Sequence, residues 1–273
     1  MKNILVPIDF SNASFNAVSY AAFLANVFNT GLLLVHAYSN TSGIDENPGA
    51  KAYDSSDKLE AANKKLLKTQ IDGIARKFTV KIKGLVMKGS PVDIIGEVAQ
   101  KNHSEIIVMG MKGKGESNSI FGSTATSMID KTSIPLLIIP QNAGYQNIET
   151  ITLASDFYDE KLLSHFMLLE QLIAKFDSFI QILNVQKIDS KLTAEAIAAK
   201  MRIDLTWDKY NHSFNIIEKN DIEEGINIFL KEHPSDILVM VARKHNFIEK
   251  VLGVSHTKTM THQTKIPLLV LHE

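Results

Sequence analysis

The stretch from Glu105 to Asp130, EIIVMGMKGKGESNSIFGSTATSMID, decides the fold class. It begins with a short apolar run, 106–109, which is typical of a strand buried on both faces. A polar loop with three glycines follows, and residues 125–130 are predicted to begin a helix. A strand, a glycine-bearing loop and a helix that opens on Gly-Ser-Thr are typical of phosphate binding, because glycines let the backbone approach an anion and the first helical N–H groups point at it. An ordinary strand-to-helix loop, with glycines that only form turns, stays open as the alternative.

The composition is that of a globular protein without a strong charge. The chain has 273 residues, 45% of them hydrophobic, and a net charge of −1, so no bulk field favours nucleic acid or an anionic membrane. There is no cysteine, which excludes disulfides and thiolate metal sites. The apolar runs are too short to span a bilayer, and the first residues reach Asp9 too soon for a signal peptide. A cytoplasmic location is the expectation.

Outside the opening stretch, apolar runs alternate with helical patterns. Strands are predicted over 4–8, 32–37, 79–87, 106–109 and 134–139, and helices from residue 11 or 12, over 57–78, from 91 to near 103 and from 125. Ser90 is predicted to cap the helix that starts at Pro91. This alternation predicts an α/β fold with a doubly wound parallel sheet.

The second half of the chain repeats the first. ITLASDF at 151–157 matches ILVPIDF at 4–10, and three further segments (180–185, 235–240 and 266–270) match 32–37, 104–109 and 134–138 in the same order. Four matches in one order indicate an internal duplication. Two domains are therefore predicted, at 1–141 and 148–273, with a linker between them.

The combined motifs resemble a known family. They are VPIDF at 6–10, VHA at 35–37, MGMKG at 109–113, GST at 122–124 and IPLLII at 134–139. Together they resemble the universal stress proteins, and the duplication resembles the tandem members of that family. The resemblance implies that each domain is a five-stranded parallel sheet in the order 3-2-1-4-5 with helices on both faces. Ligands of such sheets bind where the chain order reverses, at the ends of strands one and four.

The resemblance also implies an adenine-nucleotide site in the first domain. The implied ligand is ATP, with AMP or ADP as alternatives and with Mg²⁺ able to accompany ATP. The expected binding residues are Pro7, Asp9, Ala37, Met109, Gly110, Gly113, Gly122, Ser123 and Thr124. The acidic residue would bond the ribose or the adenine edge, the backbone near Ala37 would pair with adenine, and the last four residues would hold phosphates. Asp9 has a second interpretation, because an acid after a first strand can cap the following helix.

Two departures from the family pattern bear on this site. The first domain has eight residues between Gly113 and Gly122 where nucleotide-binding members have nine. In the second domain, Val241 and Lys244 replace the first two glycines, and their side chains would crowd a phosphate. Nucleotide is therefore expected in the first domain only.

The sequence carries no sign of a catalytic centre. It lacks a P-loop, a GxGxxG strand-to-helix turn and a GxSxG elbow, and its histidines match no zinc spacing. The expected function is an adenine-nucleotide-binding stress-response module, in signalling or protection, with no catalytic or metal-binding residue assigned. A nucleotide-free scaffold and a slow ATP hydrolase are the alternatives. Strands 134–139 and 266–271 are expected to pair within one chain as a pseudo-dimer. A homodimer and an unidentified protein partner stay open, and neither nucleic acid nor a membrane is expected as a partner.

Overall fold

The structure, a computed structural model, describes residues 1–39, 52–111, 123–155, 166–189, 193–242 and 266–272. The first half contains strands β1 (Ile4–Pro7), β2 (Leu32–Tyr38), β3 (Ile82–Lys88), β4 (Ile106–Met111) and β5 (Leu136–Pro140). Its helices are α1 (Asn12–Val27), α2 (Ala52–Ala75), α3 (Pro91–Lys101) and α4 (Ser123–Lys131). The second half contains β6 (Thr150–Ala154), β7 (Phe179–Gln186), β8 (His212–Glu218), β9 (Ile237–Ala242) and β10 (Leu268–His272), with α6 (Met167–Phe176), α7 (Ala194–Trp207) and α8 (Ile222–Glu232).

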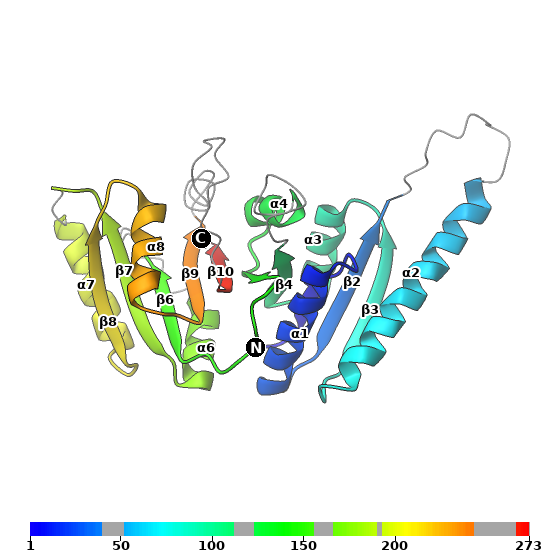
Figure 1. The fold of residues 1–273 in the computed structure, drawn as a ribbon, viewed down its shortest axis with the longest axis horizontal. Helices are drawn as coiled ribbons and strands as arrows, with labels where there is room; N and C mark the ends of the chain where they lie inside the picture. The colour runs from blue at the N-terminus through cyan, green and yellow to red at the C-terminus, as the bar shows by residue number, and fades with distance from the viewer. Residues whose placement is uncertain (40–51, 112–122, 156–165, 190–192, 243–265, 273) are drawn as a thin grey trace.

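All ten strands form one continuous sheet (Figure 1). Its order is β3-β2-β1-β4-β5-β10-β9-β6-β7-β8, so each half has the predicted order 3-2-1-4-5. Pairs within a half are parallel, whereas β5 and β10 pair antiparallel, with Leu137 opposite Leu269. The predicted α/β fold and the predicted pairing of the final strands within one chain are therefore confirmed.

Helices cover the sheet in two layers that extend across both halves. One layer holds α1, α2, α6 and α7, and the opposite layer holds α3, α4 and α8. The strands between them are buried on both faces because their side chains enter one core or the other in alternation. An antiparallel junction keeps equivalent helices of the two halves on the same face.

In the first half the predicted element boundaries hold to within three residues, except at the start of α2. Helix α2 begins at Ala52, five positions before the predicted start, and the strand predicted over 79–87 begins at Ile82. Ser90 occupies the N-cap position of α3, but its side chain makes no capping hydrogen bond. Within the described part of the chain, no helix is both long and apolar enough to cross a membrane.

The connection between the halves is fixed by hydrogen bonds to its backbone. The Asn16 side-chain amide donates to the carbonyl oxygens of Pro140 and Ala143 at 2.9 and 2.8 Å. Further along, Asp236 accepts from the backbone N–H groups of Glu149 and Thr150 at 2.8 and 2.9 Å. The domain boundaries at 141 and 148 stay a prediction.

Candidate functional site

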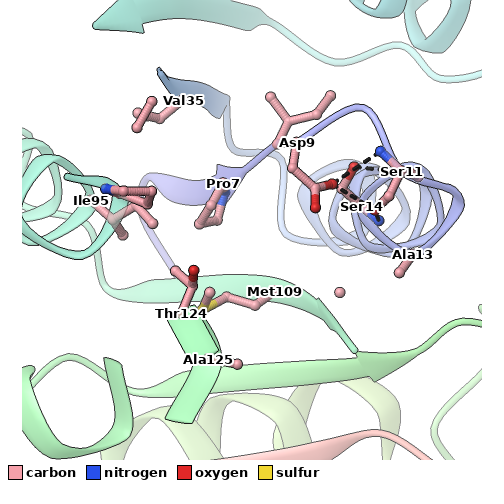
Figure 2. Close-up of a pocket in the computed structure, with 14 residues that line it drawn as sticks. Pro7, Asp9, Ser11, Ala13, Ser14, Val35, Ile95, Met109, Thr124 and Ala125 are labelled. Atoms are coloured by element: carbon pink, nitrogen blue, oxygen red, sulfur yellow. Dashed lines mark hydrogen bonds between the residues drawn. The ribbon is translucent and has the colours of Figure 1, made fainter. Parts of the chain in front are cut away.

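A cavity of about 350 Å³ lies where β1 and β4 end (Figure 2). These strands are neighbours in the sheet, and the chain order reverses between them, since β2 lies on the far side of β1 and β5 on the far side of β4. Open α/β sheets bind ligands at such a point. We call this cavity the first-domain crevice. Its volume lies in the range of small-molecule sites, roughly 300–1,000 Å³.

Six of the nine predicted binding residues line the first-domain crevice, namely Pro7, Asp9, Ala37, Met109, Gly110 and Thr124. Ser123 is the first residue of α4, whose N-terminus reaches the crevice. Gly113 and Gly122 lie outside the described residues. The structure thus brings together residues that are more than 100 positions apart in the sequence. Their role toward a ligand stays a prediction.

Part of the crevice wall is apolar. Val35 from β2, Ile95 from α3 and Met109 from β4 line it, and all three are buried (Figure 2). Small-molecule sites combine such apolar walls with a few polar groups that fix orientation. A wall of this kind can accept the flat face of an aromatic base.

The backbone of Ala37 offers an open hydrogen-bonding edge to the crevice. Ile8 donates its backbone N–H to the carbonyl oxygen of Val35 at 2.9 Å, so the polar backbone groups of Val35 point toward β1. Backbone groups alternate in direction along a strand, and those of Ala37 therefore point the same way. Strand β1 ends at Pro7, before it could pair with this position. The N–H and C=O groups of Ala37 suit the acceptor and donor atoms on the edge of a purine.

Three helix N-termini converge on the same cavity. Helix α1 contributes Ala13 and Ser14, α3 contributes Pro91, and α4 contributes Thr124. A helix N-terminus carries unpaired N–H groups and a partial positive charge, so it favours anions. The convergence gives the crevice a positive field without a lysine or arginine among its described lining residues. Phosphate groups fit this arrangement.

Asp9 lines the crevice and also supports the start of α1. Its Oδ1 accepts from the backbone N–H of Ser11 at 3.0 Å and from the Ser11 hydroxyl at 2.5 Å. Ser11 in turn caps α1, since its hydroxyl oxygen accepts from the Ser14 N–H at 3.3 Å. The N-cap of α1 is therefore Ser11, and one carboxylate oxygen of Asp9 holds this cap residue in place. The carboxylate is exposed at the crevice, so a ligand role is compatible with it.

Gly110 is required by packing inside the protein. A side chain there would collide with the backbone of Ala13 and Ser14 in the first turn of α1. Absence of a Cβ lets α1 approach β4 closely, which brings the N-terminus of α1 to the crevice. The sequence pattern identified this glycine for ligand contact, but the structure supplies a reason for it that needs no ligand.

His36 is not among the described residues that line the first-domain crevice. It is buried, and its Nδ1–H donates to the carbonyl oxygen of Ile8 at 2.8 Å. Asn184 holds the equivalent position in the second half, where its Nδ2 donates to the Ser155 carbonyl oxygen at 2.9 Å. In both halves, a side chain of the second strand thus donates a hydrogen bond to the carbonyl oxygen of the residue that follows the first strand. His36 is therefore a core residue.

The equivalent place in the second half is built differently. Val185 stands where Ala37 does, and α8 packs directly onto it, because a Cβ on Gly225 would lie 2.5 Å from the Val185 side chain. Val241, which stands where Gly110 does, is buried. Among the described residues, larger side chains thus stand at two positions that line the crevice in the first half. This geometry agrees with the expectation of nucleotide in the first domain only.

Sequence reasoning missed part of the crevice lining. The missed residues belong to the first turns of helices and to strand ends, and they include Ile8, Ser14, Val35, Ile95 and Ala125. They have no motif of their own. The rule that carboxyl ends of strands and the helices after them surround a switch point would have found them. Among the described residues, no cluster of acidic or histidine side chains could hold a metal ion.

Comparison with known sequences gives one family. The model of the universal stress protein family matches residues 1–140. A universal stress protein of Methanocaldococcus jannaschii is 29% identical over 145 residues, which cover 50% of this chain and 81% of that protein. One from Thermus aquaticus is 25% identical over 139 residues, covering 50% of this chain and 98% of that protein.

Comparison with solved structures shows the same fold over the full length. A universal stress protein from Archaeoglobus fulgidus superposes with a TM-score of 0.73 at 15% identity, covering 99% of this chain and 98% of that one. A Pseudomonas aeruginosa protein of unknown function superposes with a TM-score of 0.62 at 11% identity, covering 99% and 92%. The two-domain arrangement therefore occurs in other proteins.

Proposed function

Because the chain belongs to the universal stress protein family, we propose that its first domain binds an adenine nucleotide in the first-domain crevice. Members of this family bind nucleotides such as cAMP or ATP. The proposed ligand is ATP, with ADP or AMP as products or substitutes. The protein would act as a nucleotide-dependent module in stress signalling or protection.

One observation carries the proposal. The open backbone edge of Ala37 and the N-terminus of α4 at Thr124 border the same cavity, whose wall is apolar. The backbone edge of Ala37 suits the polar edge of a base, and the helix N-terminus suits phosphate. The apolar wall suits the flat face of the base. Asp9 is positioned to accept a hydrogen bond from a ribose hydroxyl. Mg²⁺, when bound with ATP, would neutralise phosphate charge.

The proposal is binding without efficient turnover. Asp9 is the only ionisable side chain among the described residues that line the crevice, and it already accepts two hydrogen bonds from Ser11. A general base must be able to reach and take a proton from the attacking water. One oxygen of Asp9 is already bonded to Ser11, so hydrolysis is expected to be slow at most.

Mass spectrometry of the freshly purified, denatured protein tests for a released nucleotide. Titration calorimetry with ATP, ADP, AMP and cAMP, with and without Mg²⁺, then measures affinity. Ala37→Leu places a larger side chain at the crevice and should weaken binding at least about tenfold, which is roughly 1.4 kcal/mol. Ala62→Leu is the matched control, because Ala62 is exposed on α2 and does not line the crevice.

The results separate three functions. Binding that Ala37→Leu weakens and Ala62→Leu retains supports the proposed site. Neither released nucleotide nor binding heat from any of the four ligands would reject it and leave the scaffold function. Steady ATP hydrolysis that Asp9→Ala abolishes, without loss of ATP binding, would instead identify an enzyme.

A further inference from the structure

The two outer edges of the ten-stranded sheet differ in how they are protected. Strand β3 ends the sheet on one side and carries exposed Lys83 and Lys88. Charged residues, especially lysine, are how proteins keep edge strands from pairing with other chains. Strand β8 ends the sheet on the other side, and its sequence HSFNIIE contains no lysine, proline or glycine. The β8 edge lacks the protection that the β3 edge has.

At the outer edge of β8, the backbone N–H and C=O groups of every second residue point away from the sheet. Ile180 donates its N–H to the Asn211 carbonyl oxygen, and Lys219 donates to Gln186, so odd-numbered residues point their backbone groups toward β7. The direction of the backbone N–H and C=O groups alternates along a strand. The even-numbered residues of β8 therefore point these groups away from β7; they are His212, Phe214, Ile216 and Glu218. A further strand could form hydrogen bonds along this edge.

Two β8 strands that run antiparallel would place complementary residues opposite each other. Antiparallel pairing of two β8 strands about Asn215 places each outward-pointing residue opposite another outward-pointing residue. Phe214 then faces Ile216 of the second copy, and His212 faces Glu218 of the second copy. Pairs of an aromatic with a β-branched residue are among those that stabilise neighbouring strands, and the second pair sets an imidazole opposite a carboxylate. A two-fold axis through the Asn215 pair relates the two strands, so each of these pairs occurs twice.

Helix α7, next to this edge in Figure 1, has an apolar outer side. Ile197, Met201 and Leu205 are spaced four residues apart and are 44%, 62% and 80% exposed. The other side of the helix is buried through Ile203 and Trp207. Residues at i, i+4 and i+8 share one helix face, and an apolar face is normally covered. Helix α2, the counterpart in the first half, exposes Leu59 and Leu66 but also lysines at 64, 65 and 68.

The edge and the helix are close enough to form one surface. The Lys200 ammonium lies 4.8 Å from the centre of the Phe214 ring, and Asp204 accepts from His212 Nε2 at 2.9 Å. The apolar stripe of α7 therefore runs beside β8. The β5–β10 junction shows that antiparallel pairing keeps equivalent helices on one face of the sheet. A β8–β8 junction would likewise place the two α7 helices side by side, each facing the stripe of the other.

We propose that two copies of this chain associate through antiparallel pairing of their β8 strands about Asn215, with the Ile197–Met201–Leu205 stripes of their α7 helices packed together. The partner is a second copy because both the strand register and the apolar stripe are self-complementary. The interface is separate from the first-domain crevice, so it does not depend on nucleotide binding.

A single engineered cysteine tests the register, since the natural chain has none. In the proposed pairing, the two Asn215 residues form a non-hydrogen-bonded pair, with Cα atoms about 4.5 Å apart, which a disulfide can bridge. Asn215→Cys should form a disulfide-linked dimer on mild oxidation. Leu85→Cys, at the equivalent and exposed position of β3, is the matched control and should stay monomeric. Cross-linking of Asn215→Cys no faster than that of Leu85→Cys would refute the register.

Sedimentation equilibrium tests the association itself. The wild type should reach twice its chain mass of 30.3 kDa as concentration rises. Ile216→Lys should remain monomeric, whereas Val86→Lys, at the equivalent position of β3, should still dimerise. Met201→Glu is a second variant that leaves folding intact because its side chain is exposed, and it should also be monomeric. A wild type that stays at 30.3 kDa up to about 100 µM, or a dimer that survives both variants, would overturn the proposal.

Discussion

A Cβ atom on Gly110 would lie 2.3 Å from the carbonyl oxygen of Ala13 and 2.8 Å from the backbone nitrogen of Ser14. These are backbone atoms of the first turn of α1, and they cannot move without shifting that helix. The end of β4 and the start of α1 are therefore in direct backbone contact, and the first-domain crevice opens beside that contact.

Gly110→Ala is expected to destabilise the protein. The added methyl group must displace α1, and overpacking of this kind costs about 1–3 kcal/mol of unfolding free energy. Urea unfolding followed by circular dichroism measures the change. Gly96→Ala is the control, because that glycine lies inside α3 with open space around its Cβ position. The control should be neutral or stabilise by up to about 1 kcal/mol, and equal losses in the two variants would contradict the packing role.

The serines at the N-caps of α1 and α3 should contribute different amounts to the unfolding free energy. Ser11 makes a capping hydrogen bond with the N–H of Ser14, whereas the Ser90 side chain makes none. Ser11→Ala should therefore lower the unfolding free energy by about 1 kcal/mol, while Ser90→Ala should cost less than about 0.5 kcal/mol. Thermal and urea unfolding of both variants give the comparison. A larger loss at Ser90 would mean that the cap assignment is wrong.

His36 can be exchanged for the residue that the second domain uses. His36→Leu leaves the Ile8 carbonyl oxygen without its side-chain donor in a buried site, which costs about 1–3 kcal/mol. His36→Asn supplies an amide donor, as Asn184 does for Ser155, and should be less destabilising. Urea unfolding at pH 8 measures both. If His36→Asn lowers the unfolding free energy more than His36→Leu does, the hydrogen bond to the Ile8 carbonyl oxygen is not the contribution of His36 to stability.

His272 should make stability depend on pH. Its Nε2–H donates to the Ile129 carbonyl oxygen at 3.0 Å, across the junction between the halves, and burial holds its pKa below the usual value despite the opposing effects of that bond and of Asp130. A histidine with a lowered pKa favours the folded state above its unfolded pKa of about 6.5, and this contribution is lost as the pH falls toward the folded value. The loss can be at most about 1.4 kcal/mol per pH unit.

His272→Gln isolates this effect, because glutamine keeps an N–H donor but does not titrate. The unfolding free energies of wild type and variant are compared between pH 8 and pH 5.5. The wild type should lose stability relative to the variant as the pH falls below about 6.5. A difference that stays constant over this range would show that His272 does not titrate in the folded protein.

The strand order and the pairing of the two final strands could be predicted because the motifs, among them the repeated Ile-Pro-Leu-Leu, resemble those of the universal stress proteins, and this resemblance implies both. The crevice location followed from the same order. Local side-chain choices could not be predicted in the same way. Asp9 was open between cap and ligand because both uses place an acid directly after the first strand, and only the structure shows that Ser11 is the cap and that Asp9 bonds to it.

Other features depended on contacts between distant segments. The sequence shows Gly110 next to a strand but not the backbone of Ala13 against it. It shows Val185 and Gly225 40 positions apart, and only the fold reveals that a helix glycine lies on that valine. The start of α2 was missed because its first turn, from Ala52, carries polar residues that resemble a loop.

The junction of β5 with β10 joins two domains that are also joined by the chain. A tether of this kind replaces a bimolecular encounter with an intramolecular one, so the effective concentration of each domain near the other stays fixed when the protein is diluted. Separate subunits that pair by this edge would have to use identical surfaces and carry identical sites. Here each half can change independently, and the second half has retained the pairing strand while Val185 and Val241 stand where the first half has Ala37 and Gly110. The molecule is thereby a permanently paired assembly whose two halves differ where the first-domain crevice lies.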